Sequence, residues 1–248
     1  MTGSTPPSPG ANRVAVVTGG ARRLGRHLST TLAARGYDVV ILYRNSEDDA
    51  RALEREIAAT GRRARSRAVD VGIEPQVAAA FAEIGSEEGR VDLLVNNVGN
   101  YNPQPVTRLT PEVWDATLAT NLSGAYYCCF HALPLMPTGG HIVNIGTAGL
   151  EGIRANAQGT DYYVSKTGLL VLTRALAAGY ADRKIRVNMV SPGQLDNSVD
   201  LPPADEMGLT VPLARAGTLH DVSQAVEYLL EASYVTGVNI DVAGGYRL

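Results

Sequence analysis

The segment "YYVSK" places Tyr162 four residues before Lys166, so the two side chains would share one face of a helix. A free phenol has a pKa of about 10, and a nearby ammonium lowers that pKa because it favours the phenolate. Such a phenol can donate a proton to a carbonyl oxygen while a cofactor delivers a hydride to the carbon. The pair therefore predicts carbonyl reduction, although an ordinary pair of side chains on a helix surface near the sheet would have the same spacing.

A glycine-rich turn stands near the start of the chain, in the segment "VTGGARRLGR" from Val17 to Arg26. Glycines let the backbone turn tightly and approach a phosphate, and the start of the next helix offers N–H groups to a pyrophosphate. Arg22 and Arg23 stand between the glycines, where a phosphate loop has little room for side chains. The turn predicts a dinucleotide site in which these arginines bind part of the ligand.

The end of the second expected strand indicates which part of the ligand the arginines bind. It reads "LYRNS", which is Tyr43, Arg44, Asn45 and Ser46. No carboxylate stands at its tip to hold the ribose 2′-hydroxyl of NAD. Arg44 and Ser46 can instead bind a 2′-phosphate, with Arg22 or Arg23 approaching from the other side. The pattern predicts NADPH (NADP+) as the cofactor, against the alternative of solvated surface arginines; Glu47 argues for the alternative.

Short apolar runs alternate with helical stretches along the chain. Strands are expected over 13–20, 37–44, 63–71, 91–99, 140–149, 185–193 and 234–245. Helices are expected over 23–36, 46–61, 75–89, 161–181 and 220–232, and a long one from Thr110 towards residue 136. Such strands argue for a parallel sheet covered on both faces. We predict an α/β fold, a single-domain Rossmann-like doubly wound parallel sheet of about seven strands, over residues 13–248.

The candidate motifs follow the ends of these strands. They are "TGGARRLG", "YRNS", "DV", "NNVG", "IGT" and "SPGQ", in chain order. Ligands of doubly wound sheets bind at the carboxyl ends of the strands. The clustering therefore predicts one composite site.

In this order the motifs resemble those of the short-chain dehydrogenase/reductase family, from Arg13 to the end of the chain. Thr18, Gly19, Arg23 and Gly25 match the family's glycine motif, and Tyr162 with Lys166 matches its Tyr-x-x-x-Lys pair. The resemblance implies four catalytic residues: Tyr162, Lys166, Thr147 in place of the usual serine, and Asn121 in a proton relay. It implies a cofactor-binding set made of Gly19, Arg22, Arg23, Leu24, Gly25, Tyr43, Arg44, Asn45, Ser46, Asp70, Val71, Asn97, Val98, Gly99, Tyr162, Lys166, Pro192, Gly193 and Leu195.

The chain departs from the family pattern at two places. Arg23 replaces a glycine, and "RRLG" together with "NYNPQP" resembles the pteridine reductase branch of the family. In that branch Tyr101 would stack on a pterin ring. The preferred interpretation is that Tyr101 is an aromatic residue that shapes a substrate pocket of any kind. Thr147 replaces a serine, and its methyl group narrows its rotamers. Substrate contacts are expected from Tyr101, Thr147 and Gln194. Further candidates are Glu151, Arg154, Asn156, Asn197 and a lid over 196–208.

These features favour an NADPH-dependent reductase of ketones, of the 3-oxoacyl type. A pteridine reductase-like enzyme and a non-catalytic NADP(H)-sensing regulator remain alternatives. The resemblance also implies a homotetramer or homodimer, with the helices around Asn121 and Tyr162 between subunits.

Composition limits the classes of partner, metal site and cellular location that the protein could have. The 248 residues carry a net charge of −3, which does not favour nucleic acid as a partner. Cys128 and Cys129 are adjacent and lack metal-ligand spacing, so they are expected to be buried hydrophobes, with no metal site. No apolar run reaches the roughly 20 residues of a membrane helix. Residues 1–12 are expected to be a disordered leader, and the protein to be cytoplasmic.

Overall fold

The computed structural model describes residues 13–152, 156–196, 198 and 206–246. The predicted leader over residues 1–12 lies outside the described residues. So do Arg154, Asn197 and most of the predicted lid over 196–208.

Seven parallel strands form one sheet in the order β3-β2-β1-β4-β5-β6-β7, which confirms the predicted doubly wound topology. The order reverses between β1 and β4, so their carboxyl ends border the crevice where such sheets bind ligands. The strands are β1 (Arg13–Thr18), β2 (Tyr37–Tyr43), β3 (Ala64–Ala68), β4 (Leu93–Asn96), β5 (His141–Ile145), β6 (Arg186–Pro192) and β7 (Asn239–Val242).

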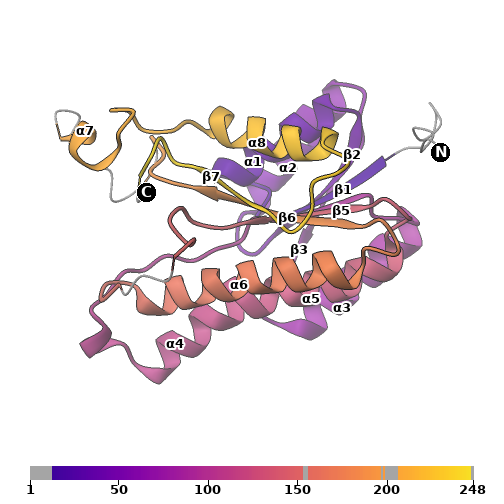
Figure 1. Cartoon of the computed structure of the whole chain (residues 1–248). Helices are drawn as coiled ribbons and strands as arrows, with labels where there is room; N and C mark the ends of the chain where they lie inside the picture. The colour runs from indigo at the N-terminus through magenta and orange to yellow at the C-terminus, as the bar shows by residue number, and fades with distance from the viewer. Residues whose placement is uncertain (1–12, 153–155, 197, 199–205, 247–248) are drawn as a thin grey trace.

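Helices cover both faces of the sheet (Figure 1). One layer holds α1 (Arg23–Ala34), α2 (Glu47–Ala59) and α8 (Leu219–Glu231). The other holds α3 (Glu74–Glu87), α4 (Pro111–Leu118), α5 (Gly124–Ala132) and α6 (Thr160–Gly179). Shorter turns are η1 (Val106–Arg108), η2 (Ala119–Ser123), η3 (Leu133–Leu135) and α7 (Met207–Thr210).

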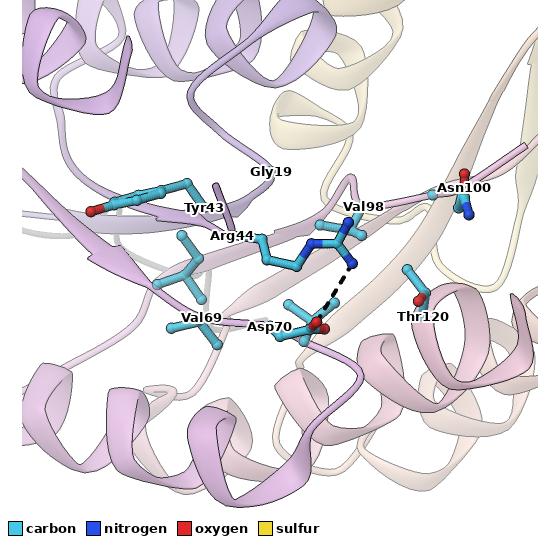
Figure 2. A pocket seen from close by; sticks show the side chains of 11 residues that line it. Gly19, Tyr43, Arg44, Val69, Asp70, Val98, Asn100 and Thr120 are labelled. Carbon is cyan, nitrogen blue, oxygen red and sulfur yellow. Dashed lines mark ion pairs between the residues drawn. The ribbon is translucent and has the colours of Figure 1, made fainter. Parts of the chain in front are cut away.

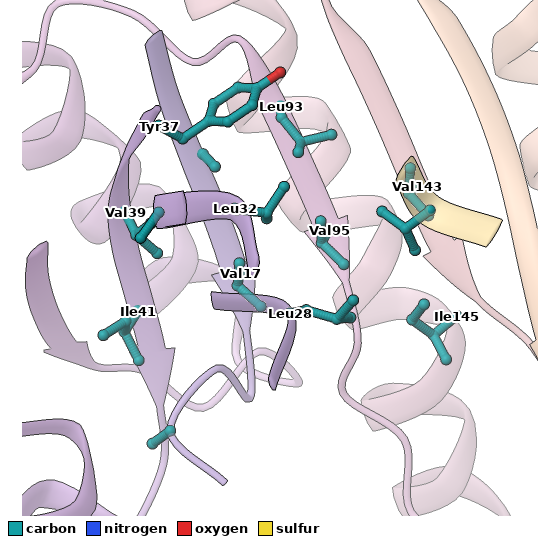
Figure 3. Close-up of a cluster of buried hydrophobic side chains, with 14 of the residues drawn as sticks. Val17, Leu28, Leu32, Tyr37, Val39, Ile41, Leu93, Val95, Val143 and Ile145 are labelled. Atoms are coloured by element: carbon teal, nitrogen blue, oxygen red, sulfur yellow. The ribbon is translucent and has the colours of Figure 1, made fainter. Parts of the chain in front are cut away.

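The alternation of side chains along each strand gives the two faces separate cores. In β1, Ala15 and Val17 pack beneath α1 and α8, with Leu28 and Leu32 of α1 (Figure 3). Val14 and Val16 face the other layer and pack with residues of α3 and α5. Because both faces are buried, the strands read as continuous apolar runs rather than as alternating ones.

The third strand, β3, is shorter than the predicted 63–71 and forms one edge of the sheet. Its Arg65 and Arg67 form ion pairs with Glu87 and Glu83 of α3. Charged side chains discourage pairing of an edge strand with another chain. The arginines that make this strand atypical in sequence therefore suit its edge position.

The long helix predicted from Thr110 is interrupted by a π-helical turn, η2, between α4 and α5. Its start is as predicted, with the Thr110 hydroxyl accepting from the Val113 N–H and Pro111 following the cap. Single π turns inside helices are often found at functional sites. This turn contains Asn121, one of the predicted catalytic residues.

Candidate functional site

The loops after β1 and β4 are held together by hydrogen bonds. The Thr18 hydroxyl accepts from the backbone N–H groups of Asn97 (2.9 Å) and Val98 (3.2 Å). The Asn97 side-chain amide donates to the Thr18 carbonyl at 3.0 Å. A Cβ at Gly25 would lie 2.1 Å from the Gly19 carbonyl oxygen, so only glycine fits there. These contacts fix the glycine-rich turn at the point where the strand order reverses.

The N-terminus of α1 is suited to an anion. Its first turn has no acidic residue, and no side chain caps it at Arg22. In contrast, α2, α3, α4, α6 and α8 each carry an acidic residue in the first turn. The dipole and open N–H groups of α1 therefore remain available for a phosphate. Arg23 adopts a φ of +47°, a conformation that favours glycine and matches the family's usual residue there.

A first pocket of about 260 Å³ opens beside this turn (Figure 2). It is lined by the end of β2, by residues that follow β1, β2, β3 and β4, and by Thr120 of η2. The Arg44 guanidinium extends across it to Asp70, with 3.5 Å between Nη1 and Oδ2. The lining residues are Gly19, Leu42, Tyr43, Arg44, Val69, Asp70, Val71, Val98, Gly99, Asn100 and Thr120.

The other residues of the predicted phosphate clamp lie outside this lining. Arg22 forms an ion pair with Asp49 in the first turn of α2. Ser46 is the N-cap residue of α2, and its side chain makes no capping hydrogen bond. Arg23 and Asn45 are exposed. Arg44 is therefore the one predicted clamp residue that the structure places in the pocket wall.

Lys166 of α6 lies beside the first pocket, on the side where Tyr162 is found. Its side chain is 2% exposed, and its ammonium donates to the Ile145 carbonyl at 2.8 Å. Burial lowers the pKa of Lys166 to about 8. The ammonium lies 5.9 Å from the centre of the Tyr162 ring. A Cβ at Gly99 would come within 3.0 Å of the Lys166 ammonium, so the first pocket and the Tyr–Lys pair adjoin each other.

Asn121 ties the loop after β4 to α6. Its side-chain oxygen accepts from the Asn100 N–H at 2.7 Å, and its amide donates to the Asn100 carbonyl at 3.0 Å. The amide also donates to the Ser165 hydroxyl at 3.1 Å, which in turn donates to the Tyr162 carbonyl at 2.6 Å. The fully buried Asn121 thus holds the π turn, the loop and the helix in one arrangement.

A second pocket of about 200 Å³ lies beyond Tyr162, where β5 and β6 end. It contains all three predicted substrate residues, Tyr101, Thr147 and Gln194, together with the predicted Pro192 and Gly193. The Tyr101 ring packs edge-on against the Tyr162 ring, with centroids 4.8 Å apart. Its further lining residues are Gly146, Tyr162, Tyr163, Ser198 and Tyr246.

Four predicted contacts lie away from both pockets. The side chains of Leu24 and Leu195 pack in the core beneath α1 and α8, and the Leu195 N–H donates to the Ser198 hydroxyl at 2.9 Å. Glu151 pairs with Arg174 at the surface. The Asn156 side chain accepts from the Gln158 N–H within a local turn.

Sequence reasoning missed several residues of the site. It placed Thr18 in the glycine motif but gave it no role in the site, where its hydroxyl joins the loops after β1 and β4. Ser165 and Tyr163 stand inside "YYVSK" but carry no pattern of their own. Tyr246 lies in a segment far from the other lining residues in sequence, and only folding brings it there.

The described residues contain no group of three or more His, Cys, Asp or Glu side chains that could hold a metal. Within the same part of the chain, no helix is long and apolar enough to cross a membrane. Cys128 and Cys129 are buried and unbridged, and burial raises the pKa of Cys129 to about 12. Both therefore behave as small core residues.

Comparisons with known proteins agree with this architecture. A family model described as enoyl-(acyl carrier protein) reductase matches residues 19–247. Carbonyl reductase family member 4 of Danio rerio is 38% identical over 239 residues, covering 96% of this chain and 99% of that protein. A 3-oxoacyl-(acyl-carrier-protein) reductase of Staphylococcus epidermidis is 34% identical over 242 residues, covering 94% of this chain and 98% of that protein.

Two solved structures are similar over most of their length. A blue fluorescent protein from a metagenomic library, in complex with NADPH, has a TM-score of 0.88 and 35% identity, covering 95% of this chain and 98% of that one. A short chain dehydrogenase from Burkholderia cenocepacia J2315, in complex with NADP, has a TM-score of 0.88 and 32% identity, covering 95% and 97%. The glycine turn, the Tyr–Lys pair and these matches together show that the chain belongs to the short-chain dehydrogenase/reductase family of oxidoreductases, whose members use a nicotinamide cofactor.

Proposed function

We propose that the protein is an NADPH-dependent reductase that converts a ketone to an alcohol. The observation that carries the proposal is the position of Lys166, which is buried between the first pocket, at the switch point of the sheet, and the second pocket, which contains Tyr162. The two relatives named above are a carbonyl reductase and a 3-oxoacyl reductase, which supports the same reaction type.

The first pocket fits the adenosine end of a dinucleotide. The acid-free N-terminus of α1 can hold the pyrophosphate, and the Asp70 carboxylate can accept from an adenine amino group. Arg44 is the best candidate to bind a 2′-phosphate, because its guanidinium is at the pocket wall and its present partner is a partly exposed carboxylate. Exposed ion pairs are worth about 1 kcal/mol or less, so a phosphate can displace this one. NADPH and NADP in the two similar structures support this choice over NAD.

The acidic first turn of α2 limits the role of the other predicted arginine. Arg22 already pairs with Asp49, and Glu47 and Asp48 are close by in sequence. A 2′-phosphate near α2 would be repelled by these carboxylates unless Arg22 and Arg44 offset them. We therefore expect Arg44 to contribute most to selectivity, with Ser46 donating a hydrogen bond and Arg22 assisting.

Bound NADPH would supply the hydride. Tyr162 donates the proton to the carbonyl oxygen, and the Lys166 ammonium stabilises the phenolate that remains. The Thr147 hydroxyl, which also lines the second pocket, polarises the carbonyl. Asn121 positions the catalytic helix through Ser165, and any proton relay through it would use its backbone, because both polar atoms of its side chain have partners.

Assembly into a homodimer or homotetramer is part of the proposal. Tyr126 and Phe130 of α5 are 45% and 57% exposed, and Val164 and Val171 of α6 are 42% and 64% exposed. Both helices belong to the same layer (Figure 1). Exposed apolar side chains on adjacent helices favour contact with a second copy.

The test is oxidation of NADPH and of NADH by the purified protein, followed by absorbance. The panel holds a 3-oxoacyl thioester, aromatic ketones, quinones and an oxidised pterin. Turnover with NADPH supports the proposal if Tyr162→Phe abolishes it and Tyr228→Phe, at an exposed position of α8, leaves it unchanged. Turnover of the pterin alone would favour the pteridine reductase alternative. NADPH binding without turnover, unrelieved by Thr147→Ser, would favour a nucleotide-sensing regulator.

A further inference from the structure

The second pocket has an unusual lining. Four of its ten lining residues are tyrosines, whereas the whole chain has 11 tyrosines in 248 residues. The other described lining residues are small or polar, and none of them is Leu, Ile, Val or Met. A saturated acyl chain packs best against aliphatic side chains, which this part of the wall does not offer.

The tyrosines come from three places in the chain. Tyr101 follows β4, Tyr162 and Tyr163 belong to α6, and Tyr246 follows β7. The Tyr163 ring meets the Tyr162 ring at 86°, with centroids 5.6 Å apart, and the Tyr101 ring also contacts the Tyr162 ring. The proposed proton donor therefore has two aromatic neighbours.

The position of Tyr101 is fixed by its surroundings. The loop that carries it pairs with the segment before α6, where the Gly159 N–H donates to the Gln104 carbonyl at 3.0 Å and the Val106 N–H donates to the Ala157 carbonyl at 2.9 Å. Gly159 has a φ of +73°, and a Cβ there would lie 3.2 Å from Cε2 of Tyr101. The ring therefore forms a defined wall, rather than a side chain that moves aside for any substrate.

The same lining carries no charge. No described residue of the second pocket is Asp, Glu, Lys, Arg or His. A substrate carboxylate or phosphate placed there would lose its hydration without gaining a charged partner, so an uncharged molecule is favoured.

Resting on the proposed reductase function, we infer that the substrate is an uncharged carbonyl compound whose carbonyl is conjugated with a flat aromatic ring. The ring packs between Tyr101 and Tyr246, and the carbonyl oxygen points to Tyr162 and Thr147. Offset and edge-to-face contacts with tyrosine rings favour such a ring over a saturated ring of the same size.

The experiment compares acetophenone with 1-cyclohexylethanone, which have the same carbon skeleton. The aromatic ketone is intrinsically the less electrophilic of the two, so a preference for it reports on the pocket. We expect kcat/KM with NADPH to be about tenfold higher for acetophenone, and 4-acetylbenzoate to react at least tenfold more slowly than acetophenone. Equal or reversed preference between the two neutral ketones would overturn the inference.

Variants of Tyr101 test whether this residue causes the preference for the aromatic ketone. Tyr101→Leu should lower kcat/KM for acetophenone about three- to tenfold and leave 1-cyclohexylethanone within twofold, while Tyr101→Phe keeps the preference because it keeps the ring. Tyr228→Leu, on the exposed side of α8, is the matched control. An equal loss with both ketones in Tyr101→Leu would show that Tyr101 supports the fold rather than selects the ring.

A separate readout distinguishes this inference from the proposed function. If no ketone is reduced, the reductase proposal fails, and binding of 1-phenylethanol and 1-cyclohexylethanol to the protein with NADP+ is measured by calorimetry. Tighter binding of the aromatic alcohol, lost in Tyr101→Leu, would support the aromatic pocket even then. Equal binding, or no binding of the aromatic alcohol, would refute it.

Discussion

Replacing Lys166 by methionine should make the folded protein more stable at neutral pH while abolishing its proposed activity. Lys166 is 2% exposed, and burial lowers its pKa from 10.5 to about 8. This difference, at 1.36 kcal/mol per pKa unit, corresponds to about 3 kcal/mol of destabilisation. Methionine has similar length and no charge, so it removes that cost. It also removes the hydrogen bond to the Ile145 carbonyl, worth about 1 kcal/mol, which leaves a net gain of about 2 kcal/mol.

The effect of Lys166 on the free energy of unfolding depends on pH. Below about pH 8 the lysine is protonated in both states, so the full cost of burying the ammonium is present. Between about pH 8 and 10.5 the unfolded chain binds a proton that the folded one does not, and the stability of the wild type rises with pH. The advantage of Lys166→Met should therefore be largest at pH 7 and nearly vanish at pH 10.

Thermal unfolding without nucleotide, at fixed protein concentration, measures the effect. A gain of about 2 kcal/mol should raise Tm by about 4–8 °C at pH 7. Lys184→Met is the matched control, since Lys184 is the other lysine and is exposed; its Tm should change by about 1 °C or less. A lower Tm for Lys166→Met at pH 7, or an equal rise at pH 7 and pH 10, would refute this account of the buried ammonium.

Four further outcomes are expected. Arg44→Gln should weaken NADPH binding about 10- to 100-fold and NADH binding by less than threefold by calorimetry, with Arg51→Gln as control; equal losses would remove Arg44 from the phosphate site. In ketone reduction, kcat/KM should fall as pH rises through about 8, where the Lys166 ammonium is lost, so a profile flat to pH 10 would contradict its role. Gly25→Ala should abolish nucleotide binding and cost about 1–3 kcal/mol or more in denaturant unfolding, because its Cβ would meet a backbone oxygen at 2.1 Å; unchanged binding would show that the turn can shift. Light scattering should show a dimer or tetramer that Phe130→Glu dissociates, and a monomeric wild type would rule out assembly.

Much of the architecture follows from local sequence, because local patterns have local causes. Apolar strands alternate with helices, glycines stand where the backbone needs a positive φ or a close approach, and Thr110 with Pro111 starts a helix as expected. The order of motifs along a doubly wound sheet then places them at one edge. Tyr162 and Lys166 share a helix face because they are four residues apart on α6, and Tyr162 lines the second pocket.

Other features depend on distant segments and could not be read from neighbours in the chain. The pairing of Arg22 with Asp49, and of Arg44 with Asp70, decides which arginine is in the pocket, and both pairs join different elements. The π turn at Asn121 is likewise fixed by contacts with Asn100 and Ser165 rather than by its own residues.

The sequence by itself determined the family, the doubly wound parallel sheet and the Tyr–Lys pair, because each is written in short-range spacing. Only the tertiary structure decided the character of the second pocket. Tyr163 and Tyr246 are ordinary tyrosines in sequence, and only the fold places them in one lining with Tyr162 and with Tyr101, the tyrosine that the sequence did indicate. Burial, which turns Lys166 from a surface cation into a group with a pKa of about 8, is likewise a property of the folded chain alone.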